Sequence, residues 1–484
     1  MRIDKYYLYA INAIHLNRKR LSFVILLVAG VVALLSRCMS PGAAQHTDPR
    51  GAGYAGMAAC LDCHKGIGNT YVHAAHALTS RVADIHTVDG PFGSGAAGGG
   101  TTGSGAAGEA GATGSEANNE FIYDAGHKVI MEERDSGLFQ VAVTARGQEA
   151  HRFDIAVGSG RKAQTYLYWK GDGVFQLPVS YFVTEHSWAN SPYYPPDSIW
   201  FGRAVAVGCF ECHSSSIGTK TMLHKNFFEG TPQYDRATLI YGIDCERCHG
   251  PGAVHVAWQR AHPEDTVARY MARFAALGRQ QRLDVCAACH SGAHSGQVRS
   301  VFHFKPGDTL ANYYFADPRS AKAPENTDVH GNQYELLTAS QCYLRSKTLE
   351  CGSCHDVHVR ERENLTVFAS RCMHCHVVGG GAAGGGGVGG EFAGGSGVGA
   401  VAAGHAGGEV AGAAHAGGEV AGVKVDRSFL ISNCIDCHMP ARASARITML
   451  TQTQRDPIAD LVRSHYITVY PEETKKKLAA LTSH

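Results

Sequence analysis

Seven short segments of the 484-residue chain repeat the spacing Cys-x-x-Cys-His. Two thiols three residues apart can each bond one vinyl group of a porphyrin, and the histidine that follows is then held beneath the iron as its proximal ligand. This is the attachment pattern of haem c. We number the motifs 1 to 7 in chain order: Cys60-Cys63-His64, Cys209-Cys212-His213, Cys245-Cys248-His249, Cys286-Cys289-His290, Cys351-Cys354-His355, Cys372-Cys375-His376 and Cys434-Cys437-His438.

Zinc sites and a disulfide framework are the alternative readings of this cysteine pattern. The motifs use 14 of the 16 cysteines. Zinc requires paired Cys-x-x-Cys half-sites and has no reason to demand a histidine after every one. A disulfide framework would not fix the cysteine spacing at three residues each time. We therefore predict seven covalently attached haems c, numbered as their motifs.

The seven motif histidines leave 20 of the 27 histidines as candidate distal ligands. A histidine three to six residues after a motif cannot pass around its own macrocycle. His255, His294 and His358 can therefore serve only neighbouring haems. We predict the distal set His76, His255, His330, His358 and His465, with His186, His224 and His294 competing for the remaining irons and His303 as a further candidate.

The supply of histidines is sufficient for every iron to carry two of them. Fully ligated iron suits electron transfer, because no coordination position is left for a substrate. The pattern thus predicts an exported electron carrier built from closely packed haems that mostly have two histidine ligands. The alternative is a multihaem oxidoreductase with one open haem, and the sequence identifies no catalytic residue for it.

The composition restricts how the haems are housed. About 50 residues per haem remain outside the glycine-rich tracts, too few to give each porphyrin its own hydrophobic core. We therefore expect the haems to share walls. The formal charge of the chain is +1, and ionisation of two propionates on each haem would bring the holoprotein to about −13. Nothing in the sequence indicates nucleic-acid binding.

The first 37 residues resemble an export signal or a membrane anchor. A basic cluster, Arg18-Lys19-Arg20, precedes 15 uncharged residues, Leu21–Leu35. That length suits a signal peptide and is short for a membrane span of about 20 residues. Cys38 lies where a lipoprotein would be lipidated, although Arg37 departs from the small residue expected there, and an uncleaved anchor is the alternative. We expect a periplasmic, membrane-tethered protein that receives electrons from redox proteins or from membrane quinol-linked donors.

Changes in composition divide the rest of the chain. The predicted parts are a first haem segment (38–89), a Gly-rich linker (90–118), an antiparallel β insertion (119–185), a multihaem core with haems 2 to 6 (186–376), a Gly/Ala-rich insertion (377–424) and a last haem segment (425–484). The predicted fold class is mainly α and irregular, with the small antiparallel β region lying between haems 1 and 2.

Local patterns predict individual elements. Alternating apolar residues indicate strands at Phe121–Tyr123, Lys128–Glu133, Leu138–Thr144, Arg152–Val157 and Gln164–Trp169. Apolar residues at helical spacing indicate helices at Val254–Arg260 and Glu264–Leu277. A closing helix is expected to begin at Pro471.

Three motif regions resemble the cytochrome c-554 / c-prime-type family of multihaem cytochromes, also described by its cytochrome c-552/4 domain. They are motif 1 with His73 and His76, motif 3 with the continuation Gly-Pro-Gly-Ala-Val-His255, and motif 5 with Asp-Val-His358. The resemblance implies c-type haem binding and electron transfer. It also implies relatives that act on nitrogen or sulfur compounds such as nitrite, hydroxylamine or tetrathionate, which is the basis for the oxidoreductase alternative.

Overall fold

The computed structural model describes residues 48–94, 118–220, 231–292, 297–315, 324–376, 418–420, 423–425, 427–451 and 457–482. The chain divides into two compact units, Met1–Asp48 and Pro49–His484. Almost all of the first unit, including the predicted export segment and Cys38, lies outside the described residues. The description that follows concerns the second unit.

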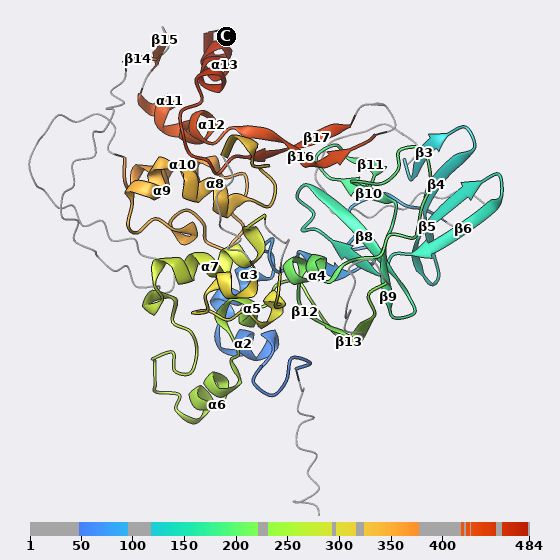
Figure 1. Ribbon diagram of the computed structural model, residues 1–484, viewed down its shortest axis with the longest axis horizontal. Coiled ribbons are helices and arrows are strands. Elements are labelled where there is room, and N and C mark those ends of the chain that lie inside the picture. Colours follow the sequence, from blue (N-terminus) through green and yellow to red (C-terminus); the bar gives the residue numbers. More distant parts are fainter. Residues whose placement is uncertain are drawn as a thin grey trace, which may run out of the picture. The chain divides into compact units, whose positions relative to one another are not determined.

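Six of the seven motifs lie on short α-helices or run from a helix into the residues directly after it (Figure 1). Motif 5 begins instead in the 3-10 helix η5, Cys351–Ser353. The six helices are α2 (Met57–Cys63), α4 (Val207–His213), α5 (Cys245–His249), α7 (Arg279–His290), α10 (Leu365–Met373) and α12 (Cys434–His438). Side chains three and four residues apart face the same side of a helix, so this local structure directs both thiols and the imidazole toward one place.

The other helices connect the motifs. They are α3 (Lys65–Tyr71), α6 (Ala253–Ala261), α8 (Gln333–Ala339), α9 (Gln341–Arg345), α11 (Arg427–Ser432) and α13 (Pro471–Thr482), with short 3-10 turns η1 (Phe274–Ala276), η2 (Val301–His303), η3 (Leu310–Tyr313) and η4 (Pro324–Asn326). The helices expected near 254–260 and from Pro471 are confirmed. The helix expected over Glu264–Leu277 is wrong: only η1 forms there, and Tyr270 has a positive φ of 58° that a helix does not tolerate.

Two sheets lie between motifs 1 and 2 along the chain. A six-stranded sheet has the order β1-β7-β8-β10-β11 with β9 paired to β8, and a five-stranded sheet has the order β2-β4-β5-β6 with β3 paired to β4. The strands are β1 (Ser80–Val82), β2 (Gly93–Ser94), β3 (Glu120–Asp124), β4 (His127–Arg134), β5 (Gly137–Thr144), β6 (Gly147–Arg152), β7 (Ile155–Val157), β8 (Ala163–Lys170), β9 (Gly173–Gln176), β10 (Val179–Phe182) and β11 (Ser187–Asn190). Four of the five predicted strand runs are confirmed, whereas the run Arg152–Val157 is divided between the end of β6 and β7.

The two sheets share one apolar core. Met131 from β4, Tyr166 from β8 and Trp188 from β11 belong to a single buried cluster. On the other side of the six-stranded sheet, Phe210 of α4 packs with Ile155 and Leu167 in a second cluster. Burying a phenylalanine side chain contributes about 1.5–3 kcal/mol. This packing fixes the helix of motif 2 against the sheet.

Three further strand pairs show that the predicted fold class is wrong. They are β12 (Ser214–Thr219) with β13 (Tyr234–Tyr241), β14 (Gly418–Val420) with β15 (Val423–Val425), and β16 (Ala441–Met449) with β17 (Ile458–Arg463), all antiparallel. With the two larger sheets, they give this chain mixed α and β content rather than a mainly helical fold. A strand begins directly after motif 2 and another begins after a gap of two residues beyond motif 7, and neither was expected from the sequence.

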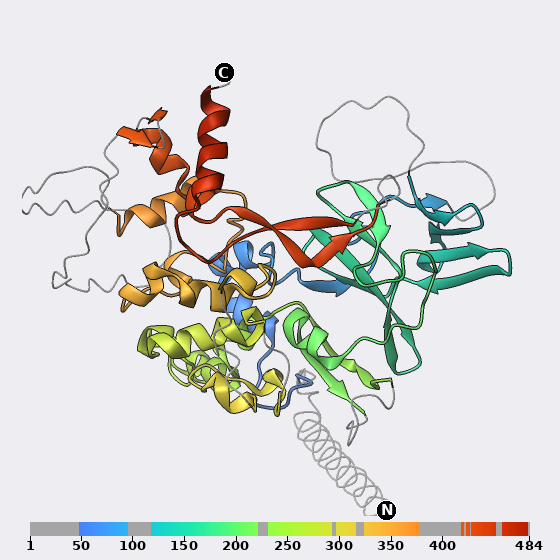
Figure 2. The same cartoon turned by 45° about the horizontal axis from the view of Figure 1, so that its top comes forward.

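The β16–β17 hairpin extends from the last motif to the two larger sheets (Figures 1 and 2). Met449 is buried against Phe182 and Ala189, the backbone N–H of Asn190 donates to the carbonyl oxygen of Leu450, and Lys162 forms an ion pair with Asp460. The hairpin therefore ties the C-terminal haem segment to a part of the chain more than 250 residues earlier.

Candidate haem-binding sites

Imidazole rings from distant parts of the chain lie close together in pairs. The ring centres of His76 and His290 lie 6.0 Å apart. Two further pairs have the same spacing: His249 and His358 at 6.0 Å, and His355 and His465 at 6.1 Å. Each pair joins one motif histidine to one histidine from outside the motifs.

This spacing fits two ligands of one haem iron. A bond from a first-row metal to an imidazole nitrogen is about 2.0–2.1 Å long, so two imidazoles on opposite sides of one metal have ring centres about 6 Å apart. Within the described residues, no three His, Cys, Asp or Glu side chains gather into a group that would hold a metal ion. A pair of imidazoles is what the chain has to provide when the iron takes its other four ligands from a porphyrin.

The protonation state of these rings also suits metal binding. Burial, together with the neighbouring imidazole of His290, lowers the pKa of His76 to about 4. Burial and the neighbouring imidazoles lower the pKa of His249 and of His465 to about 4 as well. These rings are neutral at pH 7, which is the form in which imidazole binds a metal.

His213 of motif 2 has a comparable environment. Burial and the nearby imidazole of His330 lower its pKa to about 4. Its Nδ1 lies 2.8 Å from the hydroxyl of Thr79, and its backbone carbonyl accepts a hydrogen bond from Ser80. A hydrogen-bond partner on one ring nitrogen orients the other ring nitrogen toward a metal. The electrostatic influence of the predicted distal ligand His330 on His213 indicates that it lies near motif 2, and it also acts on His290 of motif 4.

His255 lies on α6, next to motif 1. The backbone N–H of Ala253 donates to the carbonyl of Gly53, and the Arg260 guanidinium lies 3.4 Å from the carboxylate of Asp62, inside motif 1. The Nδ1 of His255 is 2.9 Å from the carbonyl oxygen of Arg269. That contact leaves Nε2 as the nitrogen available to a metal, so haem 1 is the neighbour that this helix would serve.

The remaining candidates have different surroundings. His438 of motif 7 has its Nδ1 2.9 Å from the carbonyl of Thr468, whereas His376 of motif 6 is exposed. His186 lies exposed in a turn, with a positive φ of 47°. His303 is exposed in η2. His224 and His294 lie outside the described residues, as do nearly all of the second glycine-rich insertion and its two histidines.

Thiols of different motifs contact one another. The thiols of Cys60 and Cys245, of Cys212 and Cys289, and of Cys286 and Cys351 lie close enough to shift the pKa of one another. They connect motif 1 with motif 3, motif 2 with motif 4, and motif 4 with motif 5. None of the cysteines in the described part of the chain forms a disulfide.

Weaker electrostatic contacts extend this series. They link Cys248 to Cys289, and Cys372 to both Cys354 and Cys434. These interactions connect the motifs in the order 1-3-4-5-6-7, and motif 2 adjoins motif 4, where the Cys289 thiol donates to the carbonyl oxygen of Glu211 at 3.7 Å. This order differs from the order along the chain.

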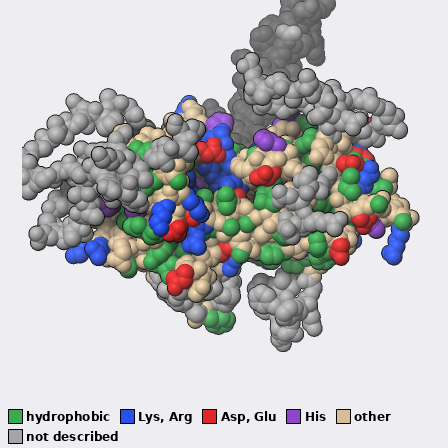
Figure 3. Space-filling view, turned by 90° about the horizontal axis from the view of Figure 1, so that it is seen from above, with side chains coloured by type: hydrophobic (Ala, Val, Ile, Leu, Met, Phe, Trp, Pro, Cys, Tyr) green, Lys and Arg blue, Asp and Glu red, His purple; other side chains and the backbone are tan. Residues whose placement is uncertain are grey.

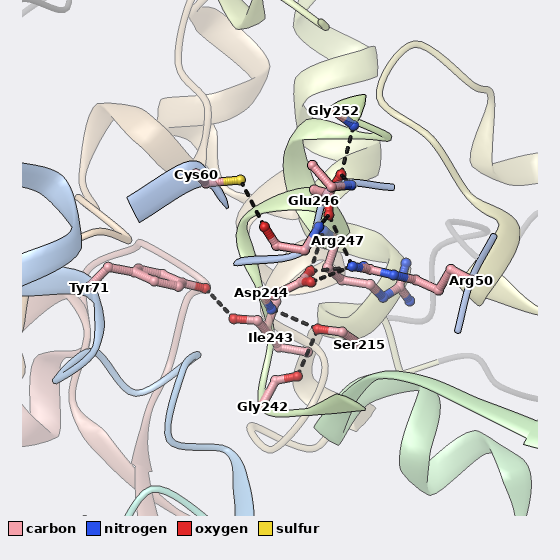
Figure 4. Close-up of polar contacts among 12 residues, drawn as sticks. Arg50, Cys60, Tyr71, Ser215, Gly242, Ile243, Asp244, Glu246, Arg247 and Gly252 are labelled. Atoms are coloured by element: carbon pink, nitrogen blue, oxygen red, sulfur yellow. Dashed lines mark hydrogen bonds and ion pairs between the residues drawn. The ribbon is translucent and has the colours of Figure 1, made fainter. Parts of the chain in front are cut away.

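Buried charges hold motif 3 in place (Figure 4). The carboxylate of Glu246, between the two cysteines, accepts hydrogen bonds from the backbone N–H groups of Ala55, Gly56 and Gly252 and pairs with Arg50 at 3.1 Å. Arg50 also pairs with Asp244 at 2.6 Å. The Glu246 side chain is 0 % exposed. Removing one partner of a buried ion pair typically costs about 3–5 kcal/mol.

The next residue, Arg247, connects motif 3 to motif 2 and to the 3-10 turn η2. Its guanidinium donates to the carbonyl oxygen of Val301 at 2.8 Å and to that of Glu211 at 3.1 Å. Glu211, between the cysteines of motif 2, is itself buried and accepts hydrogen bonds from Gln297 and from the backbone N–H of Val301. The spacer residues of the motifs thus carry structure as well as spacing.

Charged residues in or beside the later motifs also connect different segments of the chain through hydrogen bonds and ion pairs. Glu350 accepts from Arg282 of α7 at 2.8 Å, and Arg371 donates to the carbonyl oxygen of Cys354 at 2.6 Å. Asp436 pairs with Arg463 and Lys477 at 2.6 and 2.7 Å. None of these charged residues was among the predicted site residues. The available signal was a charged residue between or directly before paired cysteines.

The comparisons with known proteins add one structural likeness. No family model matches the chain, and no curated protein does. A solved structure described as "Crystal Structure of Outer Cell Wall Cytochrome OcwA" aligns with a TM-score of 0.46 and 16% sequence identity, over 88% of this chain and 81% of that one.

Proposed function

We propose that the chain is an exported c-type cytochrome with seven haems that transfers electrons between redox proteins or membrane quinol-linked donors and an acceptor outside the cytoplasm. The observation that carries the proposal is the set of three imidazole pairs at about 6 Å, each with one motif histidine. When bound, the haems supply the one-electron redox couples. The side chains of the chain attach them, ligate their irons and fix their relative positions.

The contacts between motifs support electron transfer in particular. Thioether bonds at Cys60 and Cys245 would bring the edges of haems 1 and 3 together, and those at Cys286 and Cys351 would do the same for haems 4 and 5. Electrons move rapidly between closely spaced haems. Buried ion pairs such as Arg50–Asp244 restrict movement of the motifs, so these separations would stay constant during turnover.

The position of the protein in the cell follows from the same chemistry. Haem c is attached outside the cytoplasmic membrane, and residues 1–37 have the order of charge and apolarity expected of an export signal. Among the described residues, no helix has both the length and the apolar character needed to cross a membrane. Export and a membrane tether therefore stay predictions that rest on the leader sequence.

Spectroscopy of the purified protein tests the proposal. We expect seven haems per chain by pyridine haemochrome assay and mass spectrometry, and a ferric spectrum dominated by low-spin iron. Reversible redox titration should reduce all seven. A protein without bound haem would refute the proposal. A large high-spin signal that responds to nitrite or hydroxylamine would favour the oxidoreductase alternative.

A further inference from the structure

The segment Asp328–Gln333 contacts two motifs and the C-terminal hairpin. It begins with an Asx turn, in which Asp328 Oδ1 accepts the backbone N–H of His330 at 2.7 Å. The same carboxylate is bound by the hairpin: Ser444 donates to Oδ1 at 3.0 Å, and the backbone N–H of Ala445 donates to Oδ2 at 2.6 Å. A single side chain thus connects the turn that carries His330 to β16.

The middle of the segment is closed by Asn332. Its amide donates to the backbone carbonyls of Asp328 at 2.8 Å and His330 at 3.1 Å. On its other side the amide lies against Gly292, two residues after His290. A Cβ at Gly292 would fall 1.5 Å from Asn332 Oδ1. Only glycine allows this approach, so the segment packs directly against the turn that follows motif 4.

Its last residue, Gln333, reaches the motif 4 histidine. Burial lowers the pKa of the His290 imidazole, and the Gln333 side chain lies close enough to that ring to raise it against this effect. The Gln333 Oε1 is buried and has no hydrogen-bond partner in the described part of the chain, so this acceptor is available to the N–H of His290. An amide oxygen beside the N–H of a ligating imidazole raises the basicity of that ligand and fixes its ring orientation.

We propose that Asp328–Gln333 positions the ligands of two haems at once, with Asp328 holding His330 for the iron of haem 2 and Gln333 orienting and tuning His290 on the iron of haem 4. This inference rests on the proposed function. Because motif 2 adjoins motif 4, the segment would set the potentials of two neighbouring haems. Asp328 and Gln333 are positioning residues in this scheme.

Substitutions at Gln333 test the tuning role by redox titration of the holoprotein. Gln333→Glu provides a stronger acceptor, gives the His290 ring more imidazolate character and should shift the midpoint potential of one haem to a lower value. Gln333→Leu removes the acceptor and should shift the same haem to a higher value. Gln259→Ala, on α6, is the matched control and should shift none. A purely structural role would not give shifts of opposite sign.

Asp328→Ala tests the ligand-holding role. We expect the variant to keep seven attached haems and to bind one equivalent of cyanide that the unaltered protein does not bind, because His330 is released. Asp328→Asn keeps an acceptor for His330 and Ser444 but places an amide N–H near that of Ala445, so its cyanide binding should be weaker. Asp84→Ala is the control, since Asp84 makes the same turn before His86, which is exposed and is not a predicted ligand.

The outcomes separate this inference from the function on which it rests. If the unaltered protein carries seven redox-active haems but neither Gln333 variant moves a potential, the tuning role of Gln333 is refuted. If Asp328→Ala binds no more cyanide than Asp84→Ala, the ligand-holding role is refuted. If the unaltered protein lacks haem, the proposed function itself fails.

Discussion

The tripeptide Asp-Val-His occurs twice, and the two copies are anchored differently. Asp328 and Asp356 each accept the backbone N–H of the histidine two residues later, at 2.7 and 2.9 Å. The first copy is held by Ser444 and Ala445, more than 110 residues away along the chain. In the second copy, the backbone N–H of Asp356 donates to the carboxylate of Glu361, five residues later.

This difference shows what local sequence determines and what it does not. The turn itself follows from an aspartate placed two residues before the histidine. Tertiary contacts of the aspartate and of nearby charges determine what the turn is attached to, which is either a neighbouring motif or a distant hairpin. His358 is thus tied to its own neighbourhood, whereas His330 is tied to the C-terminal segment.

Removing either histidine should give the largest effect. His358→Ala removes the ring opposite His249, and His330→Ala removes the ring beside His213. Each variant should keep seven haems and convert one iron from low to high spin, as measured by electron paramagnetic resonance and by binding of one equivalent of cyanide. His73→Ala, at an exposed position close to motif 1, is the control. A spectrum that stays wholly low-spin would show that the altered histidine is not a ligand.

A smaller effect is expected from Arg371→Leu. This guanidinium bonds the Cys354 carbonyl and the Glu361 carboxylate, which in turn accepts the N–H of Asp356. Its removal leaves the Glu361 carboxylate partly buried without its cation, and hydrogen bonds to charged groups contribute about 1.5–3 kcal/mol each. The midpoint of denaturant unfolding should fall. Cyanide should gain access to haem 3, whose predicted ligand is His358, and haem 2 should be unaffected.

Ser444→Ala should affect only the first Asp-Val-His copy, which contains Asp328 and His330. It removes one neutral donor to the Asp328 carboxylate, and such a bond contributes about 0.5–1.5 kcal/mol. Cyanide binding at haem 2 should therefore be detectable but weaker than in Asp328→Ala. Ser432→Ala, which removes an exposed hydroxyl that bonds only within its own helix, is the matched control. Equal behaviour of these two serine variants would contradict the anchoring of His330 by the hairpin.

The smallest expected effect is on the unfolding free energy at acidic pH. The hydrogen bond from Arg371 lowers the pKa of Glu361 below its usual value of 4.5. A depressed folded-state pKa contributes stability above the unfolded value, and that contribution disappears as the pH falls through the folded value. Glu361→Gln removes this titration. Unfolding free energies measured from pH 6 down to about pH 3 should decline less steeply in the variant, while Asp328-dependent cyanide binding stays unchanged.

Much of the fold followed from local patterns, and the errors have physical causes. Alternation in Leu138–Thr144 and Gln164–Trp169 predicted strands correctly because one face of each is buried in the shared core. The period in Glu264–Leu277 was misleading: Val267 and Tyr270 are exposed, so those apolar residues do not mark a buried helical face. The pairing of Ala441 with Arg463 across the hairpin depends on a contact between distant residues, which local alternation cannot reveal.

The candidate site likewise has a part that the local sequence predicts and a part that it does not. The cysteines and histidines that we predict to attach and ligate haem are identified by their spacing alone. The ring pairs, such as His355 with His465, join residues far apart in the sequence, so no local pattern predicts which rings pair. The sequence provided a set of candidate distal histidines but did not assign each one to a motif histidine. Glu246 and Arg247 looked like interchangeable spacers, and their burial depends on charges supplied by Arg50 and by backbone groups far along the chain.

The long-range ring pairs have a consequence for the synthesis of the protein. The partners His249 and His358, and likewise His355 and His465, are separated by about 110 residues, so each iron bridge would close a long loop and constrain the unfolded chain. A chain exported from its N-terminus presents motif 5 well before His465 emerges. In the interval the iron of haem 5 would be exposed to other histidines of the nascent chain. Correct maturation would then require exchange of provisional ligands, and completion of the haem 5 site would mark the end of folding.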